Sequence, residues 1–488
     1  MAPLQSTDGR RKQLGAWATP DELVELVVSH TVTADWVAGH AAPIRVIDPA
    51  CGDGRFLRAA SRRISELGGR AVLTGVDVDP LALETMAADP ALAGAERLCT
   101  DALAVDWNER TFDLVLGNPP FLSQMASGTS RGGSSRHGGG PYADAAAEFL
   151  ALAVGIAAPD AGRFGLVLPQ SILGARDAGG VRAGVDRVAD MIWSWWSPDR
   201  HFDAEVVVCA LGFQRARSPV VADGDTDTTT TATTPLPATW SHVVVQHLGV
   251  PDLPPLEVSG IVGDRSDLNA NFRDEYYGLV PAVADHADGP PLITAGLIDP
   301  GRCHWGERPV RFAKQTFVAP RVDRSLLDER MQRWARRKLV PKVLVATQTS
   351  VVEAVVDPLG EWLPGVPVTS VVPQPGQCAW EIGAVLTSPV ATVAAWHVAA
   401  GTGLSARTVR LGPSGIAAVP WPADRLDAAV AALRAGDVVS CGLAVTSAFG
   451  VASDHPMVAW WCERVSRVTH ERSPAPRPTS DGHSPATR

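Results

Sequence analysis

The first half of the chain alternates short β-branched runs with stretches of helical character. Strands are predicted at 44–47, 71–76, 111–116, 163–168 and 206–213, and a helix at 55–67. Strands that alternate with helices predict an α/β fold, in which helices cover both faces of a Rossmann-like, doubly wound and mostly parallel sheet. Ligands bind such sheets at the carboxyl ends of the strands, near the switch in strand order. The residues that follow each strand are therefore the candidates for chemistry.

Two stretches interrupt this alternation. Residues 127–141 are rich in Gly and Ser and predict a mobile loop, and residues 216–237 contain a threonine run typical of a linker or a surface excursion. After them the pattern becomes irregular, with prolines, tryptophans and short strands, which indicates a second, mixed α+β domain. We therefore expect domains at 1–245 and 246–470, and a disordered tail at 471–488, which has almost no apolar residues.

The composition is that of an ordinary globular protein, with 45% hydrophobic and 20% charged residues. The chain has no run of about eighteen uncharged apolar residues, so no membrane span is predicted. Its seven cysteines are odd in number and never spaced CxxC. This pattern favours reduced thiols of a cytoplasmic protein over a disulfide framework or a metal site.

The charge is unevenly distributed along the chain. A net charge of −10 argues mildly against a nucleic-acid partner, which usually requires a basic surface. Residues 301–342, however, contain twelve Lys and Arg against four Asp and Glu. A solvated helix face and a phosphate-binding surface explain this segment equally well.

The sequence DPACGDG, which starts at Asp48, follows the first predicted strand and opens a helix. Gly52 and Gly54 allow backbone conformations that let a ligand lie against the main chain. The spacing is neither GxGxxG nor GxxxxGKS, so NAD and ATP are disfavoured. Asp48 and Asp53 would repel a phosphate but suit a ligand that carries an ammonium and a sulfonium. Taken alone, the segment fits a glycine turn with solvated acids equally well.

Two further acids follow the next strands. Asp77 ends the second strand, twenty-nine residues after Asp48, where a carboxylate can accept both ribose hydroxyls. Asp101 follows the expected third strand, where a carboxylate can accept from an adenine amino group. Either acid alone is more often a turn or cap residue. Acids at three successive strand ends, behind one glycine loop, favour a cofactor that contains adenosine.

The tetrapeptide Asn118-Pro119-Pro120-Phe121 follows a hydrophobic strand. The lone pair of an adenine amino nitrogen is delocalised into the ring, so a methylating site needs acceptors for its two N–H groups. Asn118 can supply a side-chain oxygen, and Pro119 a carbonyl held rigid by consecutive prolines. Phe121 offers a face on which a flipped base can stack. The other reading is an Asn-Pro turn beside a core phenylalanine.

Together these motifs resemble the S-adenosylmethionine-dependent methyltransferases, in particular the gamma-class N6-adenine DNA methyltransferases of the Taq type. DPACGDGRFL is similar to their first cofactor motif, and NPPF is one accepted form of their catalytic tetrapeptide. The resemblance implies S-adenosyl-L-methionine as cofactor, with Thr19, in AWATP, at its methionine end. The cofactor-binding residues are then Thr19, Asp48, Ala50, Gly52, Gly54, Asp77 and Asp101, and the catalytic residues Asn118, Pro119, Pro120 and Phe121.

The same resemblance extends to the later parts of the chain. Phe202 is similar to a second aromatic residue that stacks on the flipped adenine, although a core phenylalanine beside Trp193 fits equally well. The C-terminal half resembles a target-recognition domain, which implies double-stranded DNA as a partner and no metal. Cleavage would belong to a separate restriction endonuclease. The residues expected to contact DNA are Arg302, Arg308, Arg311 and Lys314.

The leading interpretation is therefore a site-specific adenine DNA methyltransferase of a restriction-modification system. The alternatives are an N4-cytosine DNA methyltransferase, in which a serine more often begins the tetrapeptide, an RNA or protein-glutamine methyltransferase, and a non-catalytic DNA-binding subunit. RNA and protein methyltransferases with this motif typically lack a C-terminal recognition domain. The intact tetrapeptide and Asp77 argue against a subunit that has lost its activity.

Overall fold

The computed structural model describes residues 19–108, 110–121, 144–198, 207–215, 239–270, 273–403 and 405–471. The chain divides into two compact units. Unit 1 comprises Met1–Gly249 and Val398–Arg407, and unit 2 comprises Val250–His397 and Thr408–Arg488. The predicted loop 127–141, the threonine-rich segment 216–237 and all but the first residue of the predicted tail lie outside the described residues.

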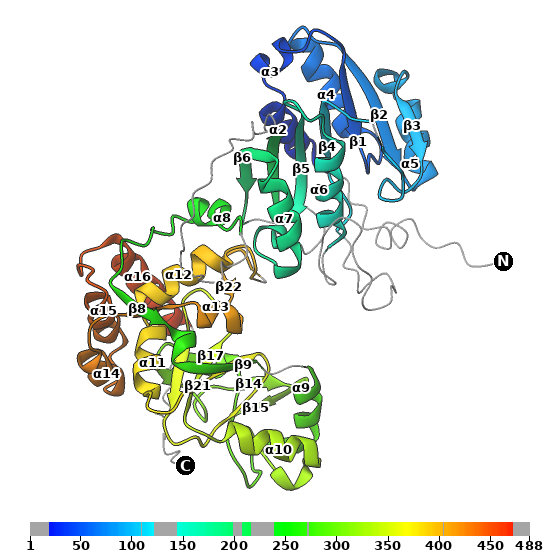
Figure 1. Ribbon diagram of the computed structural model, residues 1–488. Helices are drawn as coiled ribbons and strands as arrows, with labels where there is room; N and C mark the ends of the chain where they lie inside the picture. The colour runs from blue at the N-terminus through cyan, green and yellow to red at the C-terminus, as the bar shows by residue number, and fades with distance from the viewer. Residues whose placement is uncertain are drawn as a thin grey trace, which may run out of the picture. The chain divides into compact units, whose positions relative to one another are not determined.

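The centre of unit 1 is a seven-stranded sheet with the order β3-β2-β1-β4-β5-β7-β6 (Figure 1). Strands β1 to β5 are parallel, whereas β7 runs antiparallel to both β5 and β6. The strand order reverses between β1 and β4, which is where a doubly wound sheet binds its ligand. The bounds are β1 Ile44–Asp48, β2 Ala71–Asp77, β3 Glu96–Cys99, β4 Leu114–Gly117, β5 Arg163–Pro169, β6 Ala189–Trp196 and β7 Val208–Arg215. The predicted α/β, doubly wound fold is confirmed.

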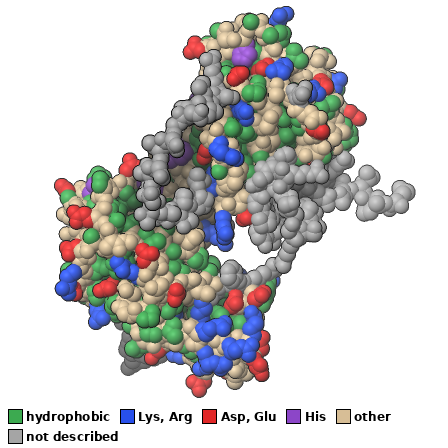
Figure 2. Space-filling view, viewed as in Figure 1, with side chains coloured by type: hydrophobic (Ala, Val, Ile, Leu, Met, Phe, Trp, Pro, Cys, Tyr) green, Lys and Arg blue, Asp and Glu red, His purple; other side chains and the backbone are tan. Residues whose placement is uncertain are grey.

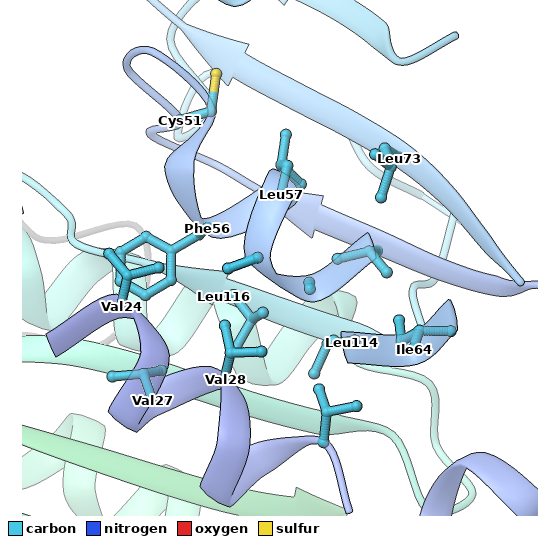
Figure 3. Close-up of a cluster of buried hydrophobic side chains, with 14 of the residues drawn as sticks. Val24, Val27, Val28, Cys51, Phe56, Leu57, Ile64, Leu73, Leu114 and Leu116 are labelled. Atoms are coloured by element: carbon cyan, nitrogen blue, oxygen red, sulfur yellow. The ribbon is translucent and has the colours of Figure 1, made fainter. Parts of the chain in front are cut away.

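Helices cover both faces of this sheet. They are α2 Asp21–Thr31, α3 Ala34–Ala38, α4 Arg55–Glu66, α5 Pro80–Ala88, α6 Ala145–Ile156, α7 Gly179–Asp186 and α8 His242–His247. Helices α2 and α4 pack on each other and on the sheet. Figure 3 shows Val24, Val27 and Val28 of α2 gathered in one cluster with Phe56 and Leu57 of α4 and with Leu114 and Leu116 of β4. Because alternate residues of a strand point to opposite faces, the buried Val115 lies on the other side.

A segment from late in the chain completes unit 1. Ser241 donates its hydroxyl to the carbonyl oxygens of Val398 and Ala400, at 3.2 and 3.0 Å. Gly401, with φ +87°, brings the backbone against Leu173. A side chain at this glycine would be strained by the backbone angle and crowded by the leucine. From the sequence we expected this segment to belong to the second domain. That expectation was wrong, because the local pattern of hydrophobic residues does not show that a late segment packs back onto an earlier domain.

Unit 2 is built on an antiparallel sheet of four strands with the order β19-β17-β21-β9. Its strands are β9 Ser266–Ala270, β17 Lys342–Ala346, β19 Ala354–Asp357 and β21 Val368–Pro373, and its helices are α9 Arg273–Leu279, α10 Glu329–Lys338, α11 Ala379–Leu386, α12 Pro389–Ala399, α13 Pro413–Ala417, α14 Asp427–Arg434, α15 Val438–Ala448 and α16 Pro456–Glu471. Helix α11 contacts β17, β19 and β21, and α14 and α15 pack against α11. The predicted mixed α+β character of this half is confirmed.

Short strands make up much of the rest of unit 2. They are β8 Val258–Ile261, β10 Val283–Ala284, β11 Leu292–Ile293, β12 Ile298–Asp299, β13 Arg302–Cys303, β14 Val310–Phe312, β15 Gln315–Phe317, β16 Arg321–Val322, β18 Gln348–Thr349, β20 Leu363–Pro364, β22 Val409–Arg410 and β23 Pro420–Pro422.

A buried ion pair links strands β17 and β19 of the four-stranded sheet, since Lys342 donates to Asp357 at 2.5 Å. Burial lowers the pKa of Lys342, and Asp357 opposes this by stabilising the charged ammonium.

Within the described ranges, no single helix is long and apolar enough to cross a membrane. The bent pair α11 and α12 meets the length and composition criteria only when its two helices are taken together.

Candidate active site

The candidate active site lies where the carboxyl ends of three neighbouring strands meet. Strand β1 is flanked by β2 on one side and β4 on the other. Asp48 ends β1, Asp77 ends β2, and Asn118 follows the last residue of β4. The structure therefore brings Asp48 and Asp77, two of the acids predicted to bind a cofactor, and the Asn-Pro-Pro turn to one edge of the sheet.

The glycine loop is fastened to the end of β2. The backbone N–H of Gly52 donates to Oδ2 of Asp77 at 2.8 Å, and that of Cys51 donates to the carbonyl of Val76 at 2.8 Å. The loop residues Gly52 and Gly54 both have positive φ, +53° and +82°. A Cβ added at Gly52 would meet nothing within 4 Å, so this face of the loop borders open space. The loop is thus held rigidly while its backbone remains accessible.

Asp77 ends β2, and Asp101 follows the neighbouring strand β3. The N–H of Thr100 donates to the carbonyl of Asp77 at 3.0 Å, which ties the residue before Asp101 to the end of β2. Asp79 N–H fixes the other oxygen of Asp77, Oδ1, at 2.8 Å. Asp101 is exposed, and its Oδ1 accepts from Leu103 N at 2.9 Å. Each carboxylate oxygen can accept more than one hydrogen bond, so both acids keep acceptor capacity for a ligand.

Asp48 is almost completely buried, with 1% of its surface exposed. Its Oδ1 accepts from the N–H of Ala50 at 3.0 Å. The pKa of Asp48 is raised to about 8, chiefly by burial and also by the nearby charges of Asp77 and Asp53, against the lowering effect of the Ala50 hydrogen bond. A carboxyl with this pKa is mostly protonated at neutral pH. A bound cation would favour its ionised form.

Gly117 allows β4 to pass directly against this carboxyl group. A Cβ added at Gly117 would lie 2.6 Å from Oδ1 and 3.2 Å from Cγ of Asp48. We expect Gly117→Ala to lower the free energy of unfolding by about 1–3 kcal/mol, because Asp48 is buried and cannot move aside without strain. Gly155→Ala is the matched control, since a Cβ there meets nothing within 4 Å and Gly155 is exposed in α6.

Calorimetry of the two variants tests this contact. The control should be no less stable than the original chain, because alanine is a better helix former than glycine. Equal melting temperatures for Gly117→Ala and the original chain would show that β4 does not press on Asp48.

Asn118 is held by one end of its side chain only. Its Nδ2 donates to Oγ1 of Thr19 at 3.0 Å. Thr19 is itself buried, and its carbonyl accepts from Nη1 of Arg55, the first residue of α4, at 3.2 Å. In contrast, Oδ1 of Asn118 is buried and has no hydrogen-bond partner among the described residues. An acceptor without a donor in a buried position is costly unless a ligand satisfies it.

The two residues after Asn118 complete the turn. Pro119 is buried and Pro120 half-buried, and Phe121 is half-buried against the apolar cluster of α2 and α4. The predicted second stacking residue, Phe202, lies outside the described residues. The tetrapeptide is therefore placed by the core on one side and by the end of β4 on the other.

Residues 5–183 match the family model described as N-6 DNA Methylase. The match lies within unit 1, so this part of the chain is similar to that family. Curated relatives include the type II methyltransferase M.TthHB8I of Thermus thermophilus, 38% identical over 110 residues, and the type II methyltransferase M.XamI of Xanthomonas campestris, 29% identical over 119 residues. The matches cover 22% and 23% of this chain, and about a fifth of the relatives' own length, 22% and 20%.

Similar solved structures include the methyltransferase subunit of a type I restriction-modification system from Streptococcus thermophilus. It is 19% identical, with a TM-score of 0.34, and the match covers 41% of this chain and 45% of that one.

Within the segment that matches this family model, two contacts could not be foreseen from the sequence. One is the hydrogen bond from Asn118 to Thr19, which are 99 residues apart. The other is the link from Arg55 to Thr19, which connects the Asn-Pro-Pro turn to the start of α4. The sequence placed Thr19 beside a cofactor by resemblance and carried no local signal for either contact. The structure makes Thr19 the residue that orients the Asn118 amide.

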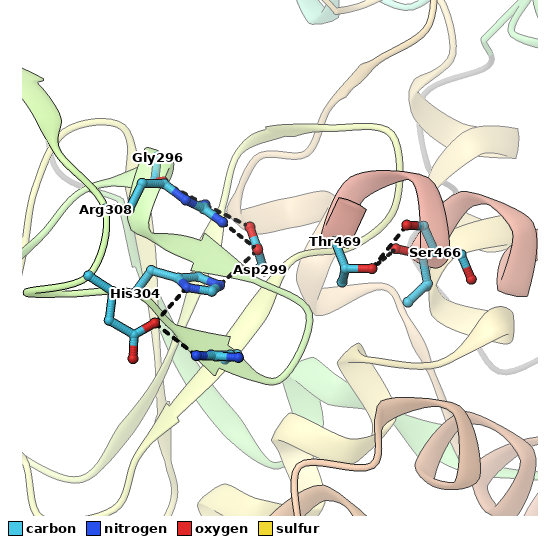
Figure 4. A network of polar contacts seen from close by, with 9 residues as sticks. Gly296, Asp299, His304, Arg308, Ser466 and Thr469 are labelled. Atoms are coloured by element: carbon cyan, nitrogen blue, oxygen red, sulfur yellow. Dashed lines mark hydrogen bonds and ion pairs between the residues drawn. The ribbon is translucent and has the colours of Figure 1, made fainter. Parts of the chain in front are cut away.

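The residues expected to contact DNA have different environments in unit 2. Arg308 is mostly buried and donates to both oxygens of Asp299, at 3.0 and 2.8 Å, and His304 lies against the same carboxylate (Figure 4). Arg302 is exposed and pairs with Glu307 at 2.8 Å. The ion pair gives Arg308 a structural role in holding the β12–β13 region together.

Arg311 and Lys314 lie on the hairpin of β14 and β15 and are both exposed. The two turn residues, Ala313 and Lys314, have φ +49° and +65°, as a two-residue turn of this kind requires. The hairpin lines a cavity of about 490 Å³, which Tyr276 also borders. Of the four predicted residues, these two are exposed and have no acid partner among the described residues.

Proposed function

We propose that the chain is a site-specific DNA methyltransferase that methylates the N6 amino group of adenine in a short duplex sequence. The family match and the sheet topology imply S-adenosylmethionine as the methyl donor. The observation that carries the proposal is the buried, unsatisfied Oδ1 of Asn118 at the end of β4. This acceptor is what an amino-group substrate requires.

The geometry suits amino-group methylation in two respects. Asn118 Oδ1 would accept one N–H of the substrate amine and the rigid Pro119 carbonyl the other, which draws the nitrogen lone pair out of conjugation. Thr19 holds the opposite end of the Asn118 amide, so the oxygen is oriented before substrate arrives. The nitrogen loses a proton only after it gains the methyl group, so the site needs no strong base.

The cofactor would lie over the glycine loop. S-Adenosylmethionine, when bound, supplies a methyl group on a positively charged sulfur. Asp77 would accept the ribose hydroxyls, and Asp101 the amino group of the cofactor's adenine. The ionised form of Asp48 would stabilise the cationic methionine end, which would lie near Ala50 and Gly54.

The target adenine would have to leave the duplex to reach Asn118. Phe121 is half-buried at the turn, where its ring could stack on the flipped base and offset part of a flipping cost of a few kcal/mol. Phe202 would be the second stacking residue. We propose that unit 2 reads the DNA sequence and that a separate endonuclease cuts the unmethylated site.

The test is to map modified bases in genomic DNA from cells that express the chain and from cells that express Asn118→Ala. We expect N6-methyladenine in one short motif with the original chain and unmodified DNA with the variant. N4-methylcytosine in the motif would show that the target base is cytosine and not adenine. Unmodified DNA in both cultures, with both proteins folded and bound to cofactor, would overturn the assignment to DNA.

A further inference from the structure

Helix α10 of unit 2 carries four exposed arginines on one face. They are Arg330, Arg333, Arg336 and Arg337. Residues three, four and seven positions apart lie on the same side of a helix. The opposite side buries Met331 and Trp334 in the apolar cluster beneath the helix. Figure 2 shows Lys and Arg side chains gathered over this part of the surface.

The charge of this α10 face is weakly compensated within the protein. The acids within ion-pair distance are Glu275, 3.9 Å from Arg330, and Glu329, 3.8 Å from Arg333 and itself 93% exposed. Arg336 and Arg337 have neither an ion-pair nor a hydrogen-bond partner for their side chains within the described ranges. Arginines elsewhere in the protein do have ion-pair partners, so the weak pairing distinguishes this helix.

The arginines of α4 provide the comparison. That helix also has four, and each one has a partner inside unit 1. Three are paired with acids, as Arg55–Asp53, Arg58–Asp89 and Arg62–Glu25, and Arg63 donates to a backbone carbonyl. The arginines of α4 thus stabilise unit 1 through contacts with neighbouring residues. Arg336 and Arg337 of α10 make no such contacts within the described ranges.

The helix dipole explains only part of the α10 face. Cations are favoured in the last turn of a helix, where Arg336 and Arg337 lie. Arg330 and Arg333 lie nearer the N-terminus, where the dipole disfavours them. Like charges at this spacing also repel one another. An anionic partner would remove both penalties.

We infer that the exposed arginine face of α10 binds the phosphate backbone of duplex DNA. The proposal rests on the proposed function, which requires a duplex partner for a chain whose net charge is −10. Guanidinium groups match phosphate oxygens through paired hydrogen bonds, and a row of them along one helix follows a charged backbone. Backbone contacts give affinity and orientation but read no bases.

This assignment differs from the one made from the sequence. The sequence favoured residues at the start of the basic segment, where Arg302 and Arg308 are paired with Glu307 and Asp299. The α10 face lies at the other end of the same segment. The bases would then be read by other residues of unit 2, for which Arg311 and Lys314 remain the candidates.

The test compares two double variants that each remove two positive charges from unit 2. Arg336→Ala/Arg337→Ala removes the two arginines without acid partners. Arg425→Ala/Arg467→Ala is the control, since both of its arginines are exposed and paired, with Asp427 and Glu463. Affinity for a duplex of random sequence is measured across a series of salt concentrations, together with cofactor affinity and melting temperature.

For the α10 variant we expect duplex affinity at physiological salt to fall about tenfold or more. The slope of log K against log salt should become shallower by about 1.8, or about 0.9 for each phosphate that an arginine no longer neutralises. Cofactor affinity and melting temperature should not change, and the control should bind like the original chain. An unchanged slope for the α10 variant, or an equal loss in the control, would overturn the proposal.

Two further outcomes separate this inference from the proposed function. If genomic DNA is methylated normally and the α10 variant binds duplex DNA like the original chain, the α10 face is not the DNA-binding surface, but the proposed methyltransferase activity stands. If no base is modified but the α10 variant alone loses duplex affinity, the α10 face is a DNA-binding surface and the proposed methyltransferase activity is wrong. Stronger competition by an RNA duplex of the same sequence would overturn the choice of DNA as the partner.

Discussion

Replacing Asn118 with alanine should lower the rate of methyl transfer by a factor of about 10² to 10³ or more. The expected cause is the removal of a buried acceptor that the fold leaves without a partner among the described residues. Cofactor affinity should stay within about twofold of the original value, because the glycine loop is anchored to Asp77 and not to Asn118. Rate and affinity should therefore separate in this variant.

Single-turnover methylation of a duplex that contains the mapped motif, alongside calorimetric titration of the cofactor, measures both quantities. Asn118→Asp and Asn118→Gln are the graded controls. Aspartate keeps an acceptor at the same position, so it should retain more activity than alanine. Glutamine moves the acceptor by one methylene and should lose nearly as much as alanine. Equal rates for all four proteins would remove Asn118 from the chemistry, and a parallel loss of cofactor affinity would make it a binding residue.

The acids of the site could be predicted because their signal is local. A strand that ends in an acid is visible in the sequence, and parallel strands bring their carboxyl ends to one edge. Asp48, Asp77 and Asp101 therefore lie where the sequence placed them. Contacts between side chains distant in sequence leave no such local trace. The bond between Asn118 and Thr19 and the approach of Gly117 to Asp48 depend on how the elements pack.

The fold shows the same division. Strands β1, β2, β4, β5 and β7 have β-branched or apolar runs, and their positions were predicted to within a few residues. Strand β6 was missed because its sequence, ADMIWSWW, reads equally well as part of a core cluster of tryptophans. The basic segment was ambiguous for another reason. The sequence gives the number of basic residues in the segment, whereas the structure shows which of them are paired with an acidic residue.

The second large effect should be the pH dependence of cofactor binding. The pKa of the buried Asp48 is raised to about 8, whereas a bound cation requires the ionised carboxylate. Below pH 8 each binding event must therefore release a proton. The dissociation constant should fall about tenfold for each unit of pH from 6 towards 8, and then level off.

Asp48→Asn isolates this effect. Asparagine can still accept from the N–H of Ala50, which lies 3.0 Å from Asp48 Oδ1, but it does not titrate. The variant should bind more weakly than the original chain above pH 8 and show little of its pH dependence. Any titration of the cofactor's own amino group is the same for both proteins, so it cancels in the ratio of their dissociation constants. Parallel profiles for the two proteins would show that Asp48 does not face the cation.

Stability without cofactor gives an independent check with a defined sign. The folded-state pKa of Asp48 lies above its ordinary value of 3.8, so the folded state favours the protonated form of this carboxyl. That stabilisation is complete below about pH 4 and is lost as the pH rises through about 8. The original chain should therefore lose stability relative to Asp48→Asn between about pH 4 and pH 8, and the difference should level off above pH 8. A constant difference over this range would place the carboxyl in a more polar environment than its burial indicates, and the proton released on cofactor binding would then have to come from another group.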